Sequence, residues 1–233
     1  MKTSNNDHDN DNVIDLFTRC PYSQRDSMRF IRLAPELDGL EMLYSNDSSG
    51  DKLFSLKILC WALRDNGEVV GLVPWLNSVV ACTEIVDPLN GNFEGYYDPG
   101  IDEIFFESPI HKVVELETAA EYYDSQSDNP EDTVQEIPDI IGTHAVMTDA
   151  DSKTLTLQEI VSWRLLFNGD INGLIVNEKK VLSTPVLPGD HCLYAAQKHN
   201  HFRYFFQHHI ANKIKSEDPE AMAAISMLVE ESK

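Results

Sequence analysis

The sequence predicts an α+β fold, with an antiparallel sheet of hairpins in the first half packed by helices and a more helical C-terminal part. Two observations favour this class. Strand-like segments come in pairs joined by turn residues, as in antiparallel sheets. Helix-like segments follow each group of strands, whereas a parallel sheet would alternate single strands with single helices.

The first hairpin is the clearest local feature of the sequence. LFSLKILCWAL (53–63) is rich in aliphatic and aromatic residues, as expected of a buried strand. Asn66 and Gly67 then supply the two positive-φ positions of a tight turn. We expect EVVGLVPWL (68–76) to return antiparallel and to bend or end at Pro74, because proline cannot donate a hydrogen bond to the ladder.

A third strand, a second hairpin and a helix complete the first half. SVVACTEI (78–85) is typical of a strand, and residues 93–108 place two aromatic arms on either side of an Asp-Pro-Gly turn at 98–100. The Ser-Pro pair at 108–109 provides a cap and a first-turn proline, which predicts a helix over 111–124.

The middle of the chain is predicted to pass from a loop to a strand and then to a helix. Residues 124–139 are polar and acidic and contain two prolines, which indicates a linker or an exposed loop. Residues 140–148 favour a strand. The capping box at 156–159 predicts the start of a helix that continues through 161–167.

The C-terminal part is predicted to contain a hairpin and two helices. Residues 174–187 are interpreted as the hairpin. The segment 198–215 places Phe202 and Phe206 on one face of a helix, with histidines on its outer face. An Asp-Pro pair starts the last helix, over 218–229.

These elements suggest four segments. They are a disordered tail (1–12), an antiparallel β-rich α+β region (13–123), the acidic linker or loop (124–139) and an α+β region ending in two helices (140–233). The two structured regions either share one domain or form two. We see no internal repeat at a fixed period.

The composition is that of a globular cytoplasmic protein. With 233 residues, 42% of them hydrophobic, the chain can bury a core of ordinary size. The N-terminus has neither a basic start nor an apolar run, so we expect no secretory signal, and the longest apolar stretch (69–82) is too short and interrupted to cross a bilayer. The cysteines form no CxxC pair, which favours free thiols in a reducing compartment. They are Cys20, Cys60, Cys82 and Cys192.

The negative charge is concentrated in one central block. The formal net charge is -21, and residues 65–152 hold 20 acidic residues and one basic residue, Lys112. A surface of this kind repels nucleic acid and anionic lipid and attracts cationic partners. Three interpretations stay open: a solvated acidic surface, a surface that mimics DNA or binds cations, and a docking surface for a basic protein.

The segment 191–215 has the opposite character. It contains no acidic residue and holds five of the eight histidines. A metal site inside one helix needs two ligands one turn apart. The two histidines on the same face of the predicted helix, His201 and His208, are instead seven residues apart. The candidate metal ligands, which would have to be brought together by the fold, are His191, Cys192, His199 and His201. The candidate ligand-binding patch for a phosphate group or a base comprises Lys198, Arg203, Tyr204 and His208.

These observations support a leading hypothesis and two alternatives. The leading hypothesis is a non-enzymatic binding or regulatory protein that uses the acidic block against the basic surface of a protein partner. The first alternative is an enzyme or ligand-binding protein that uses the segment 191–215 on a phosphorylated or metal-bound substrate. The second is a homodimer formed through the last two predicted helices. The sequence contains no nucleophile elbow, phosphate-binding loop or other cofactor motif, so it predicts no cofactor.

Overall fold

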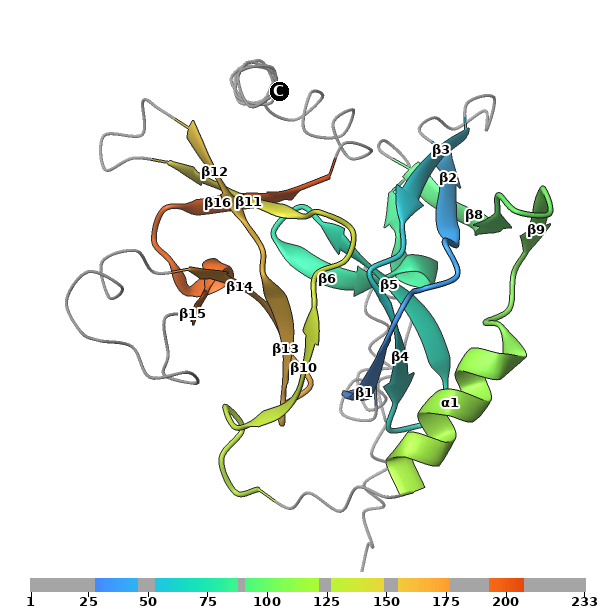
Figure 1. Cartoon of the computed structure of the whole chain (residues 1–233), viewed down its shortest axis with the longest axis horizontal. Helices are drawn as coiled ribbons and strands as arrows, with labels where there is room; N and C mark the ends of the chain where they lie inside the picture. Colours follow the sequence, from blue (N-terminus) through green and yellow to red (C-terminus); the bar gives the residue numbers. More distant parts are fainter. Residues whose placement is uncertain are drawn as a thin grey trace, which may run out of the picture.

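The computed structural model describes residues 28–45, 53–87, 91–121, 127–148, 155–176 and 193–207. In these residues the chain forms sixteen strands and one α-helix (Figure 1). The strands make four small antiparallel sheets in a propeller-like ring. The predicted α+β fold with a helical C-terminal part is therefore wrong, because the described residues are mostly β. None of the described helices is long and apolar enough to cross a membrane.

The first half contains two sheets and the helix. The first sheet has the order β1 (Phe30–Pro35), β4 (Cys60–Arg64), β5 (Val69–Trp75), β6 (Ser78–Ala81). The second has the order β3 (Leu53–Lys57), β2 (Glu41–Ser45), β8 (Gly91–Asp98), β7 (Val86–Asp87), and β9 (Glu103–Phe105) pairs with β8. A short 3-10 helix, η2 (Cys82–Glu84), follows β6, and the helix α1 (Ile110–Glu121) packs on β1 and β4.

The second half repeats this arrangement of strands. One sheet has the order β10 (Thr133–Pro138), β13 (Ser162–Leu166), β14 (Ile171–Val176), β15 (Leu193–Ala195), and η3 (Ala196–Lys198) follows β15. The other has the order β12 (Leu155–Glu159), β11 (His144–Thr148), β16 (Phe202–Phe206). Each strand of this half corresponds in order and pairing to one of the first, so we call residues 28–98 the first repeat and 131–206 the second repeat.

The correspondence extends to the sequence. Residues 58–73 and 160–175 align without a gap and are identical at 7 of 16 positions, including the Asn-Gly turn. The equivalent edge strands β1 and β10 also carry a register shift at the same place in their pairing. The expectation of no internal repeat is therefore wrong, because a single duplication about 100 residues apart does not produce a short period.

In each repeat, a buried tryptophan donates a hydrogen bond to a carboxylate in the turn after the first strand. In the first repeat, Trp61 Nε1 donates to Glu36 Oε2, and the backbone N–H of Leu40 donates to Glu36 Oε1 at 3.2 Å. In the second, Trp163 Nε1 donates to Asp139 Oδ1 at 2.8 Å, and the equivalent Thr143 N–H donates to Asp139 Oδ2 at 2.8 Å. One carboxylate thus satisfies the indole and the turn that leads to the next strand.

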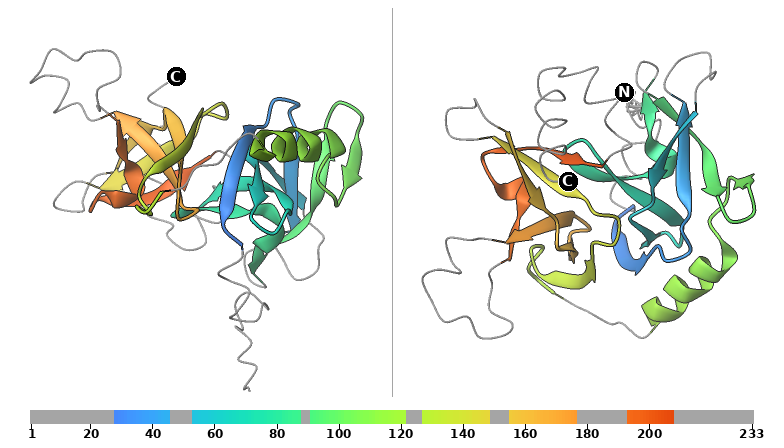
Figure 2. Two further views of the ribbon diagram at one scale, coloured as in Figure 1. Left: turned by 90° about the horizontal axis from the view of Figure 1, so that it is seen from below. Right: turned by 45° about the horizontal axis from the view of Figure 1, so that its top comes forward.

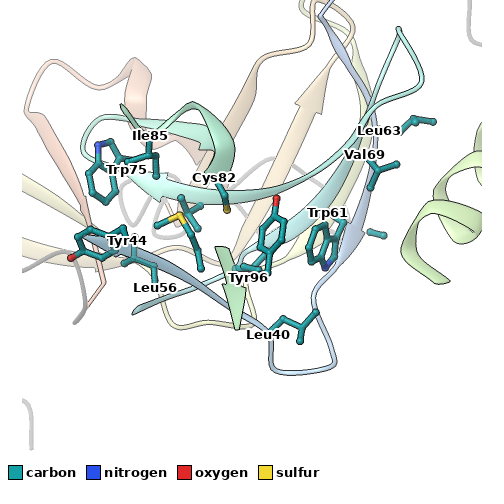
Figure 3. Packing of buried hydrophobic residues seen from close by; sticks show 14 of the residues in the cluster. Leu40, Tyr44, Leu56, Trp61, Leu63, Val69, Trp75, Cys82, Ile85 and Tyr96 are labelled. Carbon is teal, nitrogen blue, oxygen red and sulfur yellow. The ribbon is translucent and has the colours of Figure 1, made fainter. Parts of the chain in front are cut away.

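Each tryptophan also lies opposite a glycine in the neighbouring strand. Trp61 pairs with Gly71, and its ring contacts Tyr96 with the centroids 4.9 Å apart (Figure 3). In the second repeat Trp163 pairs with Gly173, and its ring lies 4.9 Å from that of Phe205. The absence of a glycine side chain leaves the space that the aromatic pair fills in each core.

The two repeats are in direct contact. Strand β1 lies beside β10, where the Gln135 side chain accepts a hydrogen bond from Leu33 N–H (2.9 Å) and donates one to Leu33 O (2.7 Å). The N–H of Phe205 in β16 donates to the carbonyl of Leu76 at the tip of the β5–β6 hairpin at 2.7 Å. The β5 strand is buried along its whole length. One face of its sheet packs on the core of the first repeat, and the other face packs against the second repeat.

Several predicted elements of the first half are confirmed. A turn at the Asn-Gly pair joins β4 to β5, and the second hairpin and the helix appear as β8–β9 and α1. The expected pair of positive-φ positions is wrong, because only Gly67 has a positive φ (86°) and its N–H donates to the Arg64 carbonyl at 3.0 Å. The predicted strand 53–63 instead breaks at Ile58 and Leu59, where the chain passes from one sheet to the other. The β5 strand also continues through Pro74 to its end, because its pairing with β4 stops at Leu72.

The predictions for the second half fail more often. The helix predicted over 156–167 is the strand pair β12 and β13, because the capping-box residues pair with β11 and Trp163 enters the core. Residues 133–138 of the predicted linker form β10, and the described part of the predicted helix 198–215 is η3 and β16. The second arm of the predicted hairpin 174–187 and the helix 218–229 lie outside the described residues, as does the tail 1–12.

Candidate functional site

The acidic block contains a segment, packed on the first repeat, in which exposed apolar and acidic residues are interspersed. It comprises residues 101–117, from the β8–β9 turn through β9 to α1, and we call it the β9–α1 face. Figures 1 and 2 show β9 and α1 on the side of the first repeat that lies away from the second repeat. The face is therefore open to a partner as far as the described residues are concerned.

The helix α1 carries both buried and exposed apolar side chains. Val113 and Leu116 pack on the first core, and Leu116 is fully buried. Ile110 and Val114, four residues apart, lie on the solvent-exposed side and are 75% and 56% exposed. A helix that only covers a core would carry polar residues there, so this second apolar pair is a candidate contact surface.

The strand β9 and the bend after it add two further exposed apolar side chains. Ile104 in β9 and Phe106 in the bend are 49% and 70% exposed. A Cβ atom built on Gly95 of β8 would lie 2.7 Å from Ile104 Cγ2 and 3.5 Å from Phe106 Cε1. Both side chains therefore lie over Gly95, and Ile101 in the preceding turn is also 63% exposed.

Exposed acidic residues are interspersed with these apolar residues along 101–117, while the basic residue of the block, Lys112, is buried. The exposed acids of the face are Asp102, Glu103, Glu107, Glu115 and Glu117. Lys112 is 4% exposed, and its ammonium lies 3.4 Å from Glu115 Oε2 and 3.6 Å from Asp38 Oδ2. Among the described residues Glu103, Glu107 and Glu117 form no ion pair, so the face carries uncompensated negative charge.

Hydrogen bonds hold the face in place on the first repeat. The Ser108 hydroxyl, predicted as a helix cap, instead donates to the Val69 carbonyl at 2.6 Å and so ties the start of α1 to β5. Asp38 Oδ2 lies 2.9 Å from His111 Nε2. The hydrogen bond with His111 and the charge of Lys112 lower the pKa of the Asp38 carboxyl, so this contact favours the ionised acid.

The histidine-rich segment is only partly described, and its side chains are divided between separate contacts. The rings of His199 and His201 lie 5.3 Å apart, and that of Tyr194 lies 5.6 Å from His199. Arg203 lies over the ring of Tyr204. Lys198 forms an ion pair with Glu131, which belongs to the acidic block.

Of the predicted metal ligands, the described contacts bring His199 and His201 side by side. The described part of the chain contains no group of three or more His, Cys, Asp or Glu side chains placed to hold a metal ion. The other predicted ligands, His191, Cys192 and His208, lie outside the described residues.

Comparisons with protein-family models, with curated proteins and with solved structures found no match for this chain.

The acidic block is evident from the sequence, whereas the exposed apolar side chains within it were not predicted. A signal was present: Ile110 and Val114 are spaced four residues apart, so they widen the apolar surface of the helix beyond the stripe formed by Val113 and Leu116. The exposure of Phe106 could not be predicted, because an aromatic residue at a strand end is usually buried.

Proposed function

We propose that this chain is a non-enzymatic binding protein whose β9–α1 face binds a basic amphipathic segment of another protein. The observation that carries the proposal is the group of exposed apolar side chains within an acidic surface whose one lysine, Lys112, is buried. Isolated exposed apolar residues are common, whereas a group of them rimmed by charge is typical of interaction sites.

The sign of the charge favours a basic partner over the alternatives. Nucleic acid and anionic lipid would be repelled by the acidic residues around the face. A second copy of the chain would bring the same negative charge against it, so self-association through this face is disfavoured as well. Lysine and arginine side chains of a partner would instead compensate Glu103, Glu107 and Glu117.

The apolar side chains would supply most of the affinity, with the acids setting the approach and the choice of partner. Phe106 is the largest of them, and aromatic residues near the centre of an interface often dominate its energy. We expect the loss of Phe106 to weaken binding by about tenfold or more.

Two model peptides of equal charge separate these contributions. One is a Lys–Leu helix with leucines along one face, and the other is its Lys–Ser counterpart without the apolar face. Fluorescence anisotropy with the full chain should give tighter binding of the Lys–Leu peptide, because only this peptide can cover Phe106 and Ile110. Equal affinities for the two peptides would contradict the proposal.

Matched variants locate the binding site. Phe106→Ser combined with Ile110→Ser should remove the preference for the Lys–Leu peptide and leave the weak, charge-driven binding of both. Val161→Ser is the control, because Val161 is an exposed apolar residue (44%) of the second repeat. A loss of the preference in the control, or its survival in the double variant, would place the site elsewhere.

A further inference from the structure

A pocket of about 190 Å³ lies where the two repeats meet, next to the C-terminal end of α1. Figure 1 shows β1 and β10 side by side there. Two arginines and four apolar residues line most of it: Arg29, Arg32, Phe30, Ala120, Val134 and Phe167. The pocket is separate from the β9–α1 face.

The pocket depends on equivalent irregularities in the two repeats. Ile31 lies at the register shift of β1, and Val134 lies at the corresponding shift of β10. Such bulges redirect side chains and occur often beside binding sites. Because one bulge comes from each repeat, the pocket exists only where the two repeats are joined.

The charged side chains of the pocket are both positive, in a protein with a net charge of -21. Arg29 donates from Nη1 to the Phe167 carbonyl at 2.9 Å, and its guanidinium carbon lies 4.9 Å from the centre of the Phe167 ring. These contacts hold the guanidinium in place, while Arg29 forms no ion pair with the described residues.

The size and the walls of the pocket define the class of ligand. A cavity of about 150 Å³ lined by aliphatic and aromatic side chains accepts benzene. The present pocket is slightly larger, has Phe30 and Phe167 in its wall, and adds guanidinium groups, which bind planar carboxylates through paired hydrogen bonds. We propose that it binds a small aromatic carboxylate, with the ring against the apolar wall and the carboxylate at Arg29.

Isothermal titration calorimetry of the full chain at constant ionic strength tests the proposal with three probes. Benzoate should bind with one-to-one stoichiometry and a Kd of about 0.1–1 mM, as expected for so small a ligand. Benzamide keeps the shape but lacks the charge, and acetate keeps the charge but lacks the ring. Both should bind at least about tenfold more weakly, since each loses one of the two contributions.

Three variants locate the site. Ala120→Leu fills the pocket from a helical position that tolerates leucine, and Arg29→Gln removes the charge; each should weaken benzoate binding about tenfold or more. Arg203→Gln, at an exposed arginine outside the pocket, should leave it unchanged. The proposal is overturned if benzoate fails to bind, if benzamide or acetate binds equally well, or if Ala120→Leu binds benzoate like the wild type.

Discussion

The two Asn-Gly turns offer a direct comparison between equivalent positions of the repeats. Gly67 and Gly169 both have a positive φ, 86° and 92°. A Cβ atom on Gly67 would meet nothing within 4 Å, whereas one on Gly169 would collide with Arg29 Cγ and lie 3.2 Å from the backbone nitrogen of Phe30. The same substitution to alanine therefore meets the same backbone strain but a different environment.

The expected magnitudes follow from these contacts. Gly67→Ala should lower the free energy of unfolding by about 1–2 kcal/mol, because a residue with a Cβ atom is strained in the left-handed backbone conformation. Gly169→Ala should cost this amount and about 1–3 kcal/mol more for overpacking, because part of the obstruction is backbone. For a chain of this length each kcal/mol lowers Tm by roughly 2–4 °C.

Differential scanning calorimetry of the two variants measures the difference. We expect a clearly lower Tm for Gly169→Ala than for Gly67→Ala, and weaker benzoate binding only for Gly169→Ala, because Arg29 is displaced from Phe167. Equal Tm values would refute the packing of Arg29 against the turn at 168–169. They would then also contradict the position of Arg29 in the pocket.

Three further substitutions test the cores and the anchoring of α1. Trp163→Phe should reduce the free energy of unfolding by about 1–3 kcal/mol in urea denaturation, because Asp139 loses a buried donor; an unchanged stability would show that the indole bond is unimportant. Gly173→Ala should cost about 1–3 kcal/mol, since the new Cβ atom would lie within 3.1 Å of three side chains; a variant as stable as the wild type would disprove this close packing. Asp38→Asn should lower Tm at pH 7 through the lost contact with His111. Because the pKa of Asp38 is lowered from 3.8, this difference should be fully present above about pH 4 and vanish as the pH falls through the folded pKa; a difference that persists at lower pH would contradict the role of the ionised carboxylate.

The sequence predicted the first half better than the second because its turn signals are local. The Asn-Gly pair at 66–67 and the Ser-Pro pair at 108–109 each determine a connection within a few residues, and both predicted elements are present. The capping box at 156–159 has the same local form but lies in a strand. There the pairing with β11 and the burial of Trp163 override the helical signal.

The internal repeat contained the information that would have corrected this error. The second Asn-Gly pair, at 168–169, follows Trp163 at the same distance as the first follows Trp61. Aligning 58–73 with 160–175 predicts for the second repeat the same hairpin as in the first. The pocket between the repeats could not be predicted in this way, because it depends on how the two edge strands β1 and β10 meet.

The salt dependence of peptide binding tests the central claim most directly. The dissociation constant of the Lys–Leu peptide should rise by about tenfold or more between roughly 0.05 and 0.5 M NaCl, because the added salt screens the acids around Phe106. The preference over the Lys–Ser peptide should survive at high salt, since salt does not weaken the apolar contact. Binding that is insensitive to salt would contradict the proposed role of the acidic face.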